Sequence, residues 1–154
     1  MKILMVSMPS LHFFRWTEQL KNAGHDIYWF NVTDSGEYTK RIDWVNQCYG
    51  WRLKWDFPSR TRLKASLPKL NKFIERFNTN ATDEAFENYL SQVKPDVVHS
   101  FALYMSCSPI LKAMKKYPNL KWIYSSWGSD LFYYQNIPDY LKDIKEVLPR
   151  VQYL

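Results

Sequence analysis

Glycine, cysteine and long hydrophobic runs are all scarce in this sequence. Only 4 of its 154 residues are glycine and 2 are cysteine. Cys48 and Cys107 have neither the spacing of a metal site nor that of a disulfide framework, so we expect a reducing, cytoplasmic environment and no bound metal. No apolar run reaches the length of about 18 residues that a membrane-spanning helix needs. The first residues have the pattern of a strand, so we expect no secretory leader.

Apolar and basic residues are abundant instead. Hydrophobic residues make up 46% of the chain, aromatic residues 18% and charged residues 23%. This composition and length are typical of one globular domain that spans residues 1–154. The net charge of +6 favours an anionic partner, without choosing among phosphate, acidic glycan, nucleic acid and a membrane surface.

Strand patterns and helix patterns alternate along the chain. Apolar and β-branched runs predict strands at 2–7, 27–32, 41–45, 96–100, 122–124 and 151–154. Apolar residues at helical spacing predict helices at 13–23, 66–77, 82–94, 108–117 and 139–147. Connections of this length cannot be hairpins. The alternation therefore predicts an α/β fold with a doubly wound, mainly parallel, Rossmann-like sheet.

The stretch 121–131 carries the clearest sign of a binding site. A short predicted strand runs there into a polar turn, 125–130, that contains Gly128. In open parallel sheets ligands bind beyond the carboxyl ends of strands, so this turn is a candidate site. Its candidate residues are Trp127, Ser129 and Asp130. Ser129 and Asp130 either bind hydroxyl groups or cap a short helix that begins near position 131.

The first strand-to-helix turn contains no glycine. A dinucleotide-binding domain has glycines there so that backbone N–H groups can approach a phosphate, and their absence weighs against a dehydrogenase. We expect no cofactor. Ser10, His12 and Arg15 surround the start of the first helix, where they either contact an anionic or hydroxyl-rich ligand or form a solvated helix end.

His99 stands at the end of a predicted buried strand. One interpretation is a general base or a sugar-binding group. The other, which we prefer slightly, is a core histidine whose hydrogen bonds are satisfied within the protein. Cys48 and Cys107 are expected to be buried thiols. No catalytic triad, metal cluster or pair of carboxylates stands out in the sequence.

Four motifs occur in an order that resembles a known enzyme family. They are KILMVS at 2–7, LKNAGHDI at 20–27, PDVVH at 95–99 and SWGSDL at 126–131. Together they resemble the N-terminal half of a GT-B glycosyltransferase of the retaining, family-four type. The resemblance covers essentially the whole chain and is least defined between 31 and 80.

The resemblance implies a two-domain enzyme with facing Rossmann-like halves, which builds a surface polysaccharide or a related glycan. This half would bind a glycan or lipid-linked acceptor. The nucleotide-sugar would belong to a C-terminal half that is absent from this chain, so the fragment alone is expected to be inactive. The acceptor-binding candidates that result are Ser10, His12, Arg15, His99, Trp127, Ser129 and Asp130.

Two positions depart from the family pattern. Pro9 and Ser10 stand where many members have a pair of glycines. Phe101 stands where several members have a catalytic histidine, two residues after the position that His99 matches. The sequence therefore assigns no catalytic residue, and His99 is the one candidate for that role.

The segment 60–77 is strongly basic. From position 60 to 76 it holds 6 Lys or Arg residues and the single acid Glu75. Apolar residues at 70, 73, 74 and 77 form one stripe of the predicted helix. This stripe either packs on the sheet or docks the enzyme on the anionic inner face of a membrane. Packing on the sheet is the expectation, since a helix has only one apolar face.

Two other functions agree with parts of the sequence. A non-catalytic, flavodoxin-like binding or regulatory domain would show the same alternation of strands and helices. A phospho-receiver of that kind needs an acidic pair after the first strand, where this chain has Ser7, Met8 and Pro9. A nucleic-acid binder would agree with the basic charge, but no recognition motif accompanies the basic segment, so we expect no nucleic-acid partner.

Overall fold

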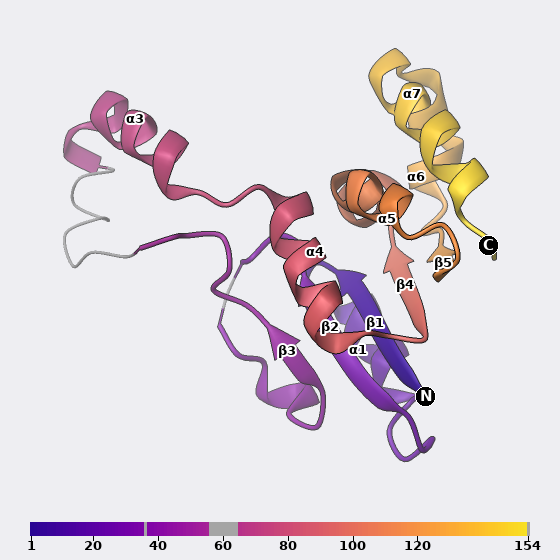
Figure 1. Ribbon diagram of the computed structural model, residues 1–154. Coiled ribbons are helices and arrows are strands. Elements are labelled where there is room, and N and C mark those ends of the chain that lie inside the picture. The colour runs from indigo at the N-terminus through magenta and orange to yellow at the C-terminus, as the bar shows by residue number, and fades with distance from the viewer. Residues whose placement is uncertain (36, 56–64, 154) are drawn as a thin grey trace.

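The structure is a computed structural model that describes residues 1–35, 37–55 and 65–153. Within these residues, 5 parallel strands form one sheet in the order β3-β2-β1-β4-β5 (Figure 1). The predicted doubly wound α/β fold is therefore confirmed. The strands are β1 (Lys2–Ser7), β2 (Asp26–Asn31), β3 (Asn46–Cys48), β4 (Val97–Phe101) and β5 (Lys121–Ser125).

Helices and helical turns connect these strands. The α-helices are α1 (Leu11–Glu18), α3 (Pro68–Asn78), α4 (Thr82–Val93), α5 (Leu111–Lys116), α6 (Ser129–Phe132) and α7 (Pro138–Val147). The 3₁₀ turns are η1 (Lys40–Ile42), η3 (Ser108–Ile110), η4 (Tyr134–Asn136) and η5 (Leu148–Arg150), and η2 (Leu103–Cys107) is a π-helical turn.

β1 lies at the centre of the sheet, between β2 and β4. Leu4, Met5 and Val6 are completely buried, because neighbouring strands cover both edges of β1 and helices cover both faces. This explains why β1 is a continuous apolar run in the sequence. β3, by contrast, lies at an edge of the sheet, where the polar residues Asn46 and Gln47 are tolerated.

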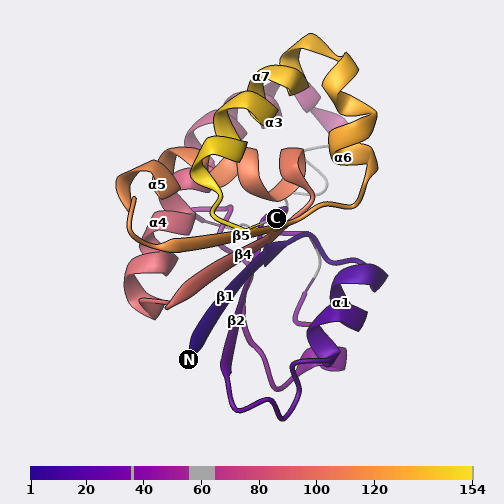
Figure 2. The ribbon, with the colours of Figure 1, turned by 90° about the vertical axis from the view of Figure 1, so that its right-hand side faces the viewer.

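The helices cover the two faces of the sheet in separate groups (Figure 2). α1 and η1 pack on one face, around Met5, Phe13 and Trp29. α4, α5 and α7 pack on the other face, around Leu4 and Trp122. The chain winds outward from β1 to β3 and later from β4 to β5, so the direction of winding reverses between β1 and β4. In sheets of this kind, ligands bind beyond the carboxyl ends of the strands at that reversal.

The third strand was predicted at the wrong position. Residues 41–45 form the end of η1 and a following turn, and β3 begins only at Asn46. Ile42 and Val45, which suggested the strand, are buried in the core on the α1 side of the sheet. The side chain of Gln47 donates to the carbonyl of Ile42 at 2.9 Å and thereby holds the turn. The apolar residues thus mark a buried turn, whereas the strand beside it is polar.

The first helix is shorter than predicted. The apolar spacing predicts one helix over 13–23, whereas α1 ends at Glu18. The chain continues from there to Ala23 in turns closed by hydrogen bonds between residues three apart, and Leu20 still packs on the core. Apolar residues keep a helix-like spacing beyond the helix because such turns have nearly the same period.

The other predicted helices and strands are present, except the strand at 151–154. The described residues of that segment form a single parallel bridge between Tyr153 and Ile123, and position 154 lies outside the described residues. The N–H of Tyr124 donates to the carbonyl of Tyr153 at 3.0 Å, which aligns this segment with β5. Among the helices of the described ranges, none combines the length and the apolar character that crossing a membrane requires.

α3 stands apart from the sheet (Figure 1). We expected its apolar stripe to pack on the sheet, but neither core cluster of the described residues contains a residue of α3. Leu70, Phe73 and Phe77 are 45%, 62% and 61% exposed. The buried side chains of the helix are Asn71 and Asn78. The packing prediction is therefore wrong, because α3 turns its polar side inward.

Asn78 holds the end of α3 against the segment before it. Its side-chain oxygen accepts from the N–H of Trp55 at 2.9 Å, and its side-chain amide donates to the carbonyl of Trp55 at 2.8 Å. Its backbone carbonyl accepts from the N–H of Lys54 at 2.9 Å. Next to it, Leu53 and Thr79 form an antiparallel bridge. A side-chain amide thus extends a short ladder of backbone hydrogen bonds.

Replacing Asn78 with leucine removes both side-chain hydrogen bonds to Trp55. We expect the amide exchange of Trp55 to accelerate by about tenfold, because one to two hydrogen bonds of ordinary strength are lost locally. The midpoint of global unfolding should change little, since α3 lies outside both core clusters. Hydrogen exchange followed by NMR measures this, with the exposed Asn119→Leu as control. Unchanged exchange at Trp55 would contradict the assigned role.

Candidate functional site

The carboxyl ends of β1, β4 and β5 lie at the same edge of the sheet, with β4 between the other two. Three connections leave the strands there: 8–10 before α1, position 102 before η2, and 126–128 before α6. We call these three connections and the residues that follow them the binding edge. It includes the place where the winding of the sheet reverses, which is the expected position for a ligand.

Ser10 begins α1 at the end of β1. Its hydroxyl oxygen accepts from the N–H of Phe13 at 3.2 Å, which caps the helix. His12 and Arg15 follow on α1, and both are exposed. Residues three apart lie on the same side of a helix, so these two side chains can point toward one ligand. The structure therefore brings Ser10 and His12 to the binding edge, with Arg15 one turn further along α1.

β4 ends in a sharp turn at Ala102. This buried residue has a φ of +63°, a left-handed value that costs a residue other than glycine roughly 1–3 kcal/mol. Its N–H donates to the carbonyl of Ser125 at 3.2 Å, which ties the turn to the end of β5. The turn also directs the N–H of Leu103 toward Asp130. Hydrogen bonds between neighbouring strand ends thus stabilise the strained backbone conformation of Ala102.

Asp130 joins the ends of β4 and β5 and is only 2% exposed. One carboxylate oxygen accepts from the N–H of Leu103 at 2.8 Å and from the hydroxyl of Tyr124 at 2.5 Å. The other accepts from the hydroxyl of Ser126 at 2.8 Å and from the N–H of Trp127 at 3.0 Å. Both oxygens are engaged by the protein itself, so Asp130 acts as a positioning residue for the loop.

Trp127 faces His12 across the binding edge. Their ring centroids are 6.1 Å apart, with the planes tilted by 55°. Trp127 is partly buried against the core on the α1 side. Gly128 follows it with a φ of +84°, a conformation that favours glycine, and Ser129 is exposed at the start of α6. The two loops that were predicted separately therefore meet at this pair of rings.

His99 lies below the binding edge, in the middle of β4. It is 5% exposed, and its Nε2 is 2.8 Å from the hydroxyl oxygen of Ser125. The rings of Phe101 and Trp16 pack on it, with centroids 4.3 and 4.6 Å away. Burial lowers the pKa of His99 to about 4, so its imidazole is neutral at pH 7. These surroundings are those of a core histidine, the interpretation that we preferred.

Neither cysteine has the character of a nucleophile. Burial raises the pKa of the half-buried Cys48 to about 11. Burial also raises the pKa of the fully buried Cys107 above its ordinary value. Both side chains are therefore thiols at neutral pH rather than reactive thiolates.

A group of aromatic side chains beside α6 was not among the residues predicted from the sequence. The ring centroid of Tyr104 lies 4.7 Å from that of Tyr134 and 5.5 Å from that of Tyr140. The centroids of Tyr134 and Tyr140 are 4.6 Å apart. A hydrogen bond to Tyr134 raises the pKa of Tyr104. Phe132 and Tyr133 are 75% and 65% exposed. The sequence signal was available, because this aromatic run comes directly after the SWGSDL motif.

Across the residues that the structure describes, no three His, Cys, Asp or Glu side chains are grouped so that they could hold a metal ion. No family model matches the sequence, and no curated protein is significantly similar to it. The fold and the geometry of the binding edge are therefore the features that bear on function.

Replacing Asp130 with asparagine should destabilise the protein. The asparagine side chain keeps one acceptor oxygen. Its NH₂ group, however, would face N–H and O–H donors that in the original protein donate to the second carboxylate oxygen of Asp130. We expect the free energy of unfolding to fall by about 3 kcal/mol, as measured by urea denaturation. Asp139→Asn, at the exposed start of α7, is the matched control and should change it by less than about 1 kcal/mol. A loss as small as that of the control would contradict the positioning role.

His99 should make the protein less stable in acid. Its folded pKa of about 4 lies below the ordinary 6.5, so the unfolded chain binds a proton first as the pH falls. The stability that the unprotonated His99 contributes is fully present above pH 6.5. As the pH falls toward 4 this contribution is lost, which lowers the free energy of unfolding by up to about 3 kcal/mol. Urea denaturation at a series of pH values measures this loss. His99→Phe should reduce the slope of the free energy of unfolding against pH, whereas replacing the exposed His25 with alanine should leave that slope unchanged. An unchanged slope in His99→Phe would contradict the assignment.

Proposed function

We propose that this chain is the acceptor-binding half of a GT-B glycosyltransferase that transfers a sugar from a nucleotide-sugar to a glycan or lipid-linked acceptor. The observation that carries the proposal is the SWGSDL turn, fixed by Asp130 beside the loop that begins α1. Both loops belong to the binding edge of a sheet with the Rossmann strand order 3-2-1-4-5. The resemblance in sequence assigns the same turn to the acceptor.

The accessible groups of these loops suit a sugar. The indole of Trp127 offers an apolar ring, and the exposed His12 and Ser129 offer hydrogen-bonding groups near it. A few polar groups that converge beside an aromatic surface are typical of small-molecule sites. Amphipathic rings suit a ligand that has both apolar C–H surfaces and hydroxyl groups. The exposed Tyr133 extends the aromatic surface beyond the turn.

The loop at 8–10 supports an acceptor rather than a nucleotide. A phosphate bound at a helix N-terminus is held by backbone N–H groups. Pro9 has no N–H, and the N–H of Phe13 already donates to the hydroxyl oxygen of Ser10. Neither of these two positions therefore supplies a backbone donor to a diphosphate. In the proposed enzyme, the nucleotide-sugar belongs to the second Rossmann-like half.

The proposal divides the candidate residues by role. His12, Trp127 and Ser129 contact the acceptor, with Arg15 further along α1. Ser10 and Asp130 hold the two loops in position through the hydrogen bonds already described. His99 supports the edge from within β4. No residue of this half is assigned to the chemical step, which requires both substrates to be held together.

The flavodoxin-like alternative is less favoured. The strand order of a flavodoxin-like sheet is 2-1-3-4-5, in which the third strand lies beside the first on the other side. Here β4, and not β3, lies beside β1 on that side. The α/β alternation is the same in both arrangements, which is why the sequence left this alternative open.

Glycan binding tests the proposal. The isotope-labelled chain is titrated with oligosaccharides selected on a glycan array, and NMR shift changes are mapped. We expect changes at the amides of 8–12 and 126–129 and at the indole N–H of Trp127. His12→Ala should weaken binding by about tenfold without changing the thermal midpoint, since this side chain is exposed.

His25→Ala is the matched control for His12→Ala. His25 is also exposed, but it precedes β2 and so lies at the amino edge of the sheet. It should leave the affinity unchanged. The proposal fails if no glycan on the array binds, if the shifts lie away from the binding edge, or if a nucleotide binds at 8–10 instead.

A further inference from the structure

α3 has an inverted orientation for a helix on a globular protein. Leu70, Phe73 and Phe77 share one side of the helix and are exposed, and the rings of Phe73 and Phe77 lie 5.2 Å apart. The side chains that α3 buries are polar, Asn71 and Asn78. The ordinary driving force for helix packing is burial of the apolar stripe. Here that stripe faces away from the body of the protein, so it is available to another apolar environment.

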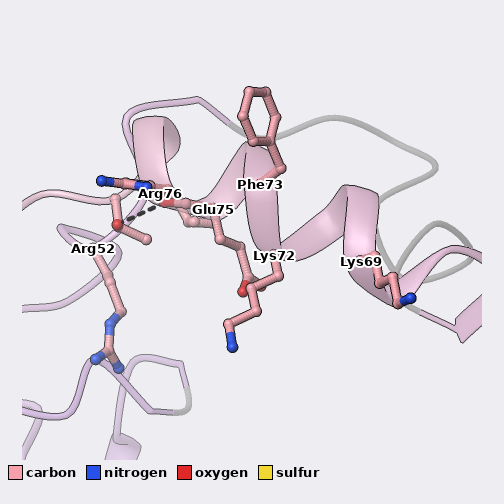
Figure 3. Close-up of a pocket in the computed structure, with 8 residues that line it drawn as sticks. Arg52, Lys69, Lys72, Phe73, Glu75 and Arg76 are labelled. Carbon is pink, nitrogen blue, oxygen red and sulfur yellow. Dashed lines mark hydrogen bonds between the residues drawn. The ribbon is translucent and has the colours of Figure 1, made fainter.

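Basic residues border this apolar stripe. Lys69, Lys72 and Arg76 follow one side of the stripe, as their helical spacing requires, and the asparagines lie on the other. Together with Arg52 they line an open hollow of about 870 Å³ (Figure 3). Of the residues that line this hollow, Glu75 is the single acid. A strip of cations thus runs along the exposed apolar side chains.

We propose that α3 docks this protein on the surface of an anionic lipid bilayer. The α3 face consists of Leu70, Phe73, Phe77, Lys69, Lys72 and Arg76. An interfacial helix of this kind buries its apolar side chains to a depth of about 5–10 Å at the boundary between headgroups and acyl chains. Lys and Arg side chains beside them reach the phosphate level and are attracted by anionic headgroups.

An exposed tryptophan lies in the segment that Asn78 joins to the end of α3. Trp55 is 45% exposed and is joined to the end of α3 through its backbone hydrogen bonds with Asn78. Tryptophan rings favour the interface between membrane and water. Lys54, next to it, is also exposed. The exposed residues of this adjoining segment thus have the same apolar and basic character as the α3 face.

The charges favour a lipid surface over a protein partner. Lysine is depleted in the centre of protein interfaces, whereas Lys69 and Lys72 directly border the apolar stripe. Two copies of the chain that met through this face would bring their cationic strips together, which costs free energy. An anionic bilayer complements both features at once, and the net charge of +6 has the matching sign.

Flotation with lipid vesicles tests the docking. The chain is mixed at low salt with vesicles of phosphatidylcholine, or of equal parts phosphatidylcholine and phosphatidylglycerol. We expect it to float only with the anionic vesicles, and less at high salt, because salt screens the attraction. The readout needs no sugar or enzymatic activity, so its outcome is independent of the proposed function.

Three pairs of substitutions separate the contribution of charge from that of apolar insertion. Lys69→Glu with Lys72→Glu, and Phe73→Ser with Phe77→Ser, should each lower partitioning onto anionic vesicles by about tenfold or more. Phe73→Leu with Phe77→Leu should retain it, which shows that apolar character is required rather than a particular shape. Circular dichroism establishes that each variant folds, and the leucine pair and the glutamate pair keep the test decisive if the serine pair does not fold.

Matched controls place the same changes elsewhere on the surface. Lys142→Glu with Lys145→Glu reverses the same amount of charge on exposed positions of α7, and Phe132→Ser removes an exposed ring beside α6. Both controls should float like the original chain. Equal loss in the controls would overturn the proposal, because net charge alone would then explain binding.

Other results would also overturn it. Absence of flotation at low salt, or equal flotation with neutral vesicles, would exclude docking on anionic lipid. Sedimentation of the chain without lipid tests whether a second copy of the chain covers the α3 face instead. A dimer that the Phe73→Ser and Phe77→Ser pair abolishes would assign the α3 face to a second copy of the chain instead.

Discussion

The shape of the binding edge depends on one buried carboxylate. Asp130 accepts hydrogen bonds from the end of β5, from the loop that follows it, and from Leu103 just after β4. A buried charge is tolerated only where such donors surround it, and removing them leaves a penalty of several kcal/mol. The carboxylate therefore selects the one loop conformation in which all its donors converge. The left-handed turn at Ala102 is part of that conformation, since it aims the N–H of Leu103.

The residues at this end of the sheet form two layers. A lower layer consists of the rings of His99, Phe101 and Trp16, which pack on one another, with His99 and Phe101 buried and Trp16 partly buried. Nearer the loops, His12 is exposed, and the partly buried Trp127 packs against the core cluster that contains Phe101. This packing supports the ring of Trp127, as a site on loops needs if it is to hold a ligand in one orientation.

The sequence predicts most of the fold because its strands and helices are marked by local periodicity. β1 is recognisable as a buried central strand from its residues alone, and the polar turn after β5 is recognisable as a strand end. β3 was misplaced because an edge strand of 3 residues carries no apolar pattern, while the buried turn beside it does. Periodicity also shows that α3 has an apolar side, but it does not show which side faces the protein.

The candidate site was only partly predictable, for a related reason. Sequence reasoning found Trp127 and Asp130 together because they share one loop. It did not find the contact of Asp130 with Leu103, 27 positions away, because that contact exists only when β4 and β5 are neighbours. The ring group of Tyr104 and Tyr140 likewise joins η2 to α7, elements whose proximity depends on the whole sheet.

The segment that carries α3 leaves and re-enters the body of the protein at adjacent points. Leu53 pairs with Thr79, and the N–H of Asn80 donates to the carbonyl of Arg52 at 2.8 Å. The entropic cost of closing a loop grows only slowly with its length, so a segment with such a narrow base can lengthen, shorten or change composition at little cost to the sheet. The surface that α3 presents can therefore change in length or composition while the strand ends that form the binding edge keep their positions.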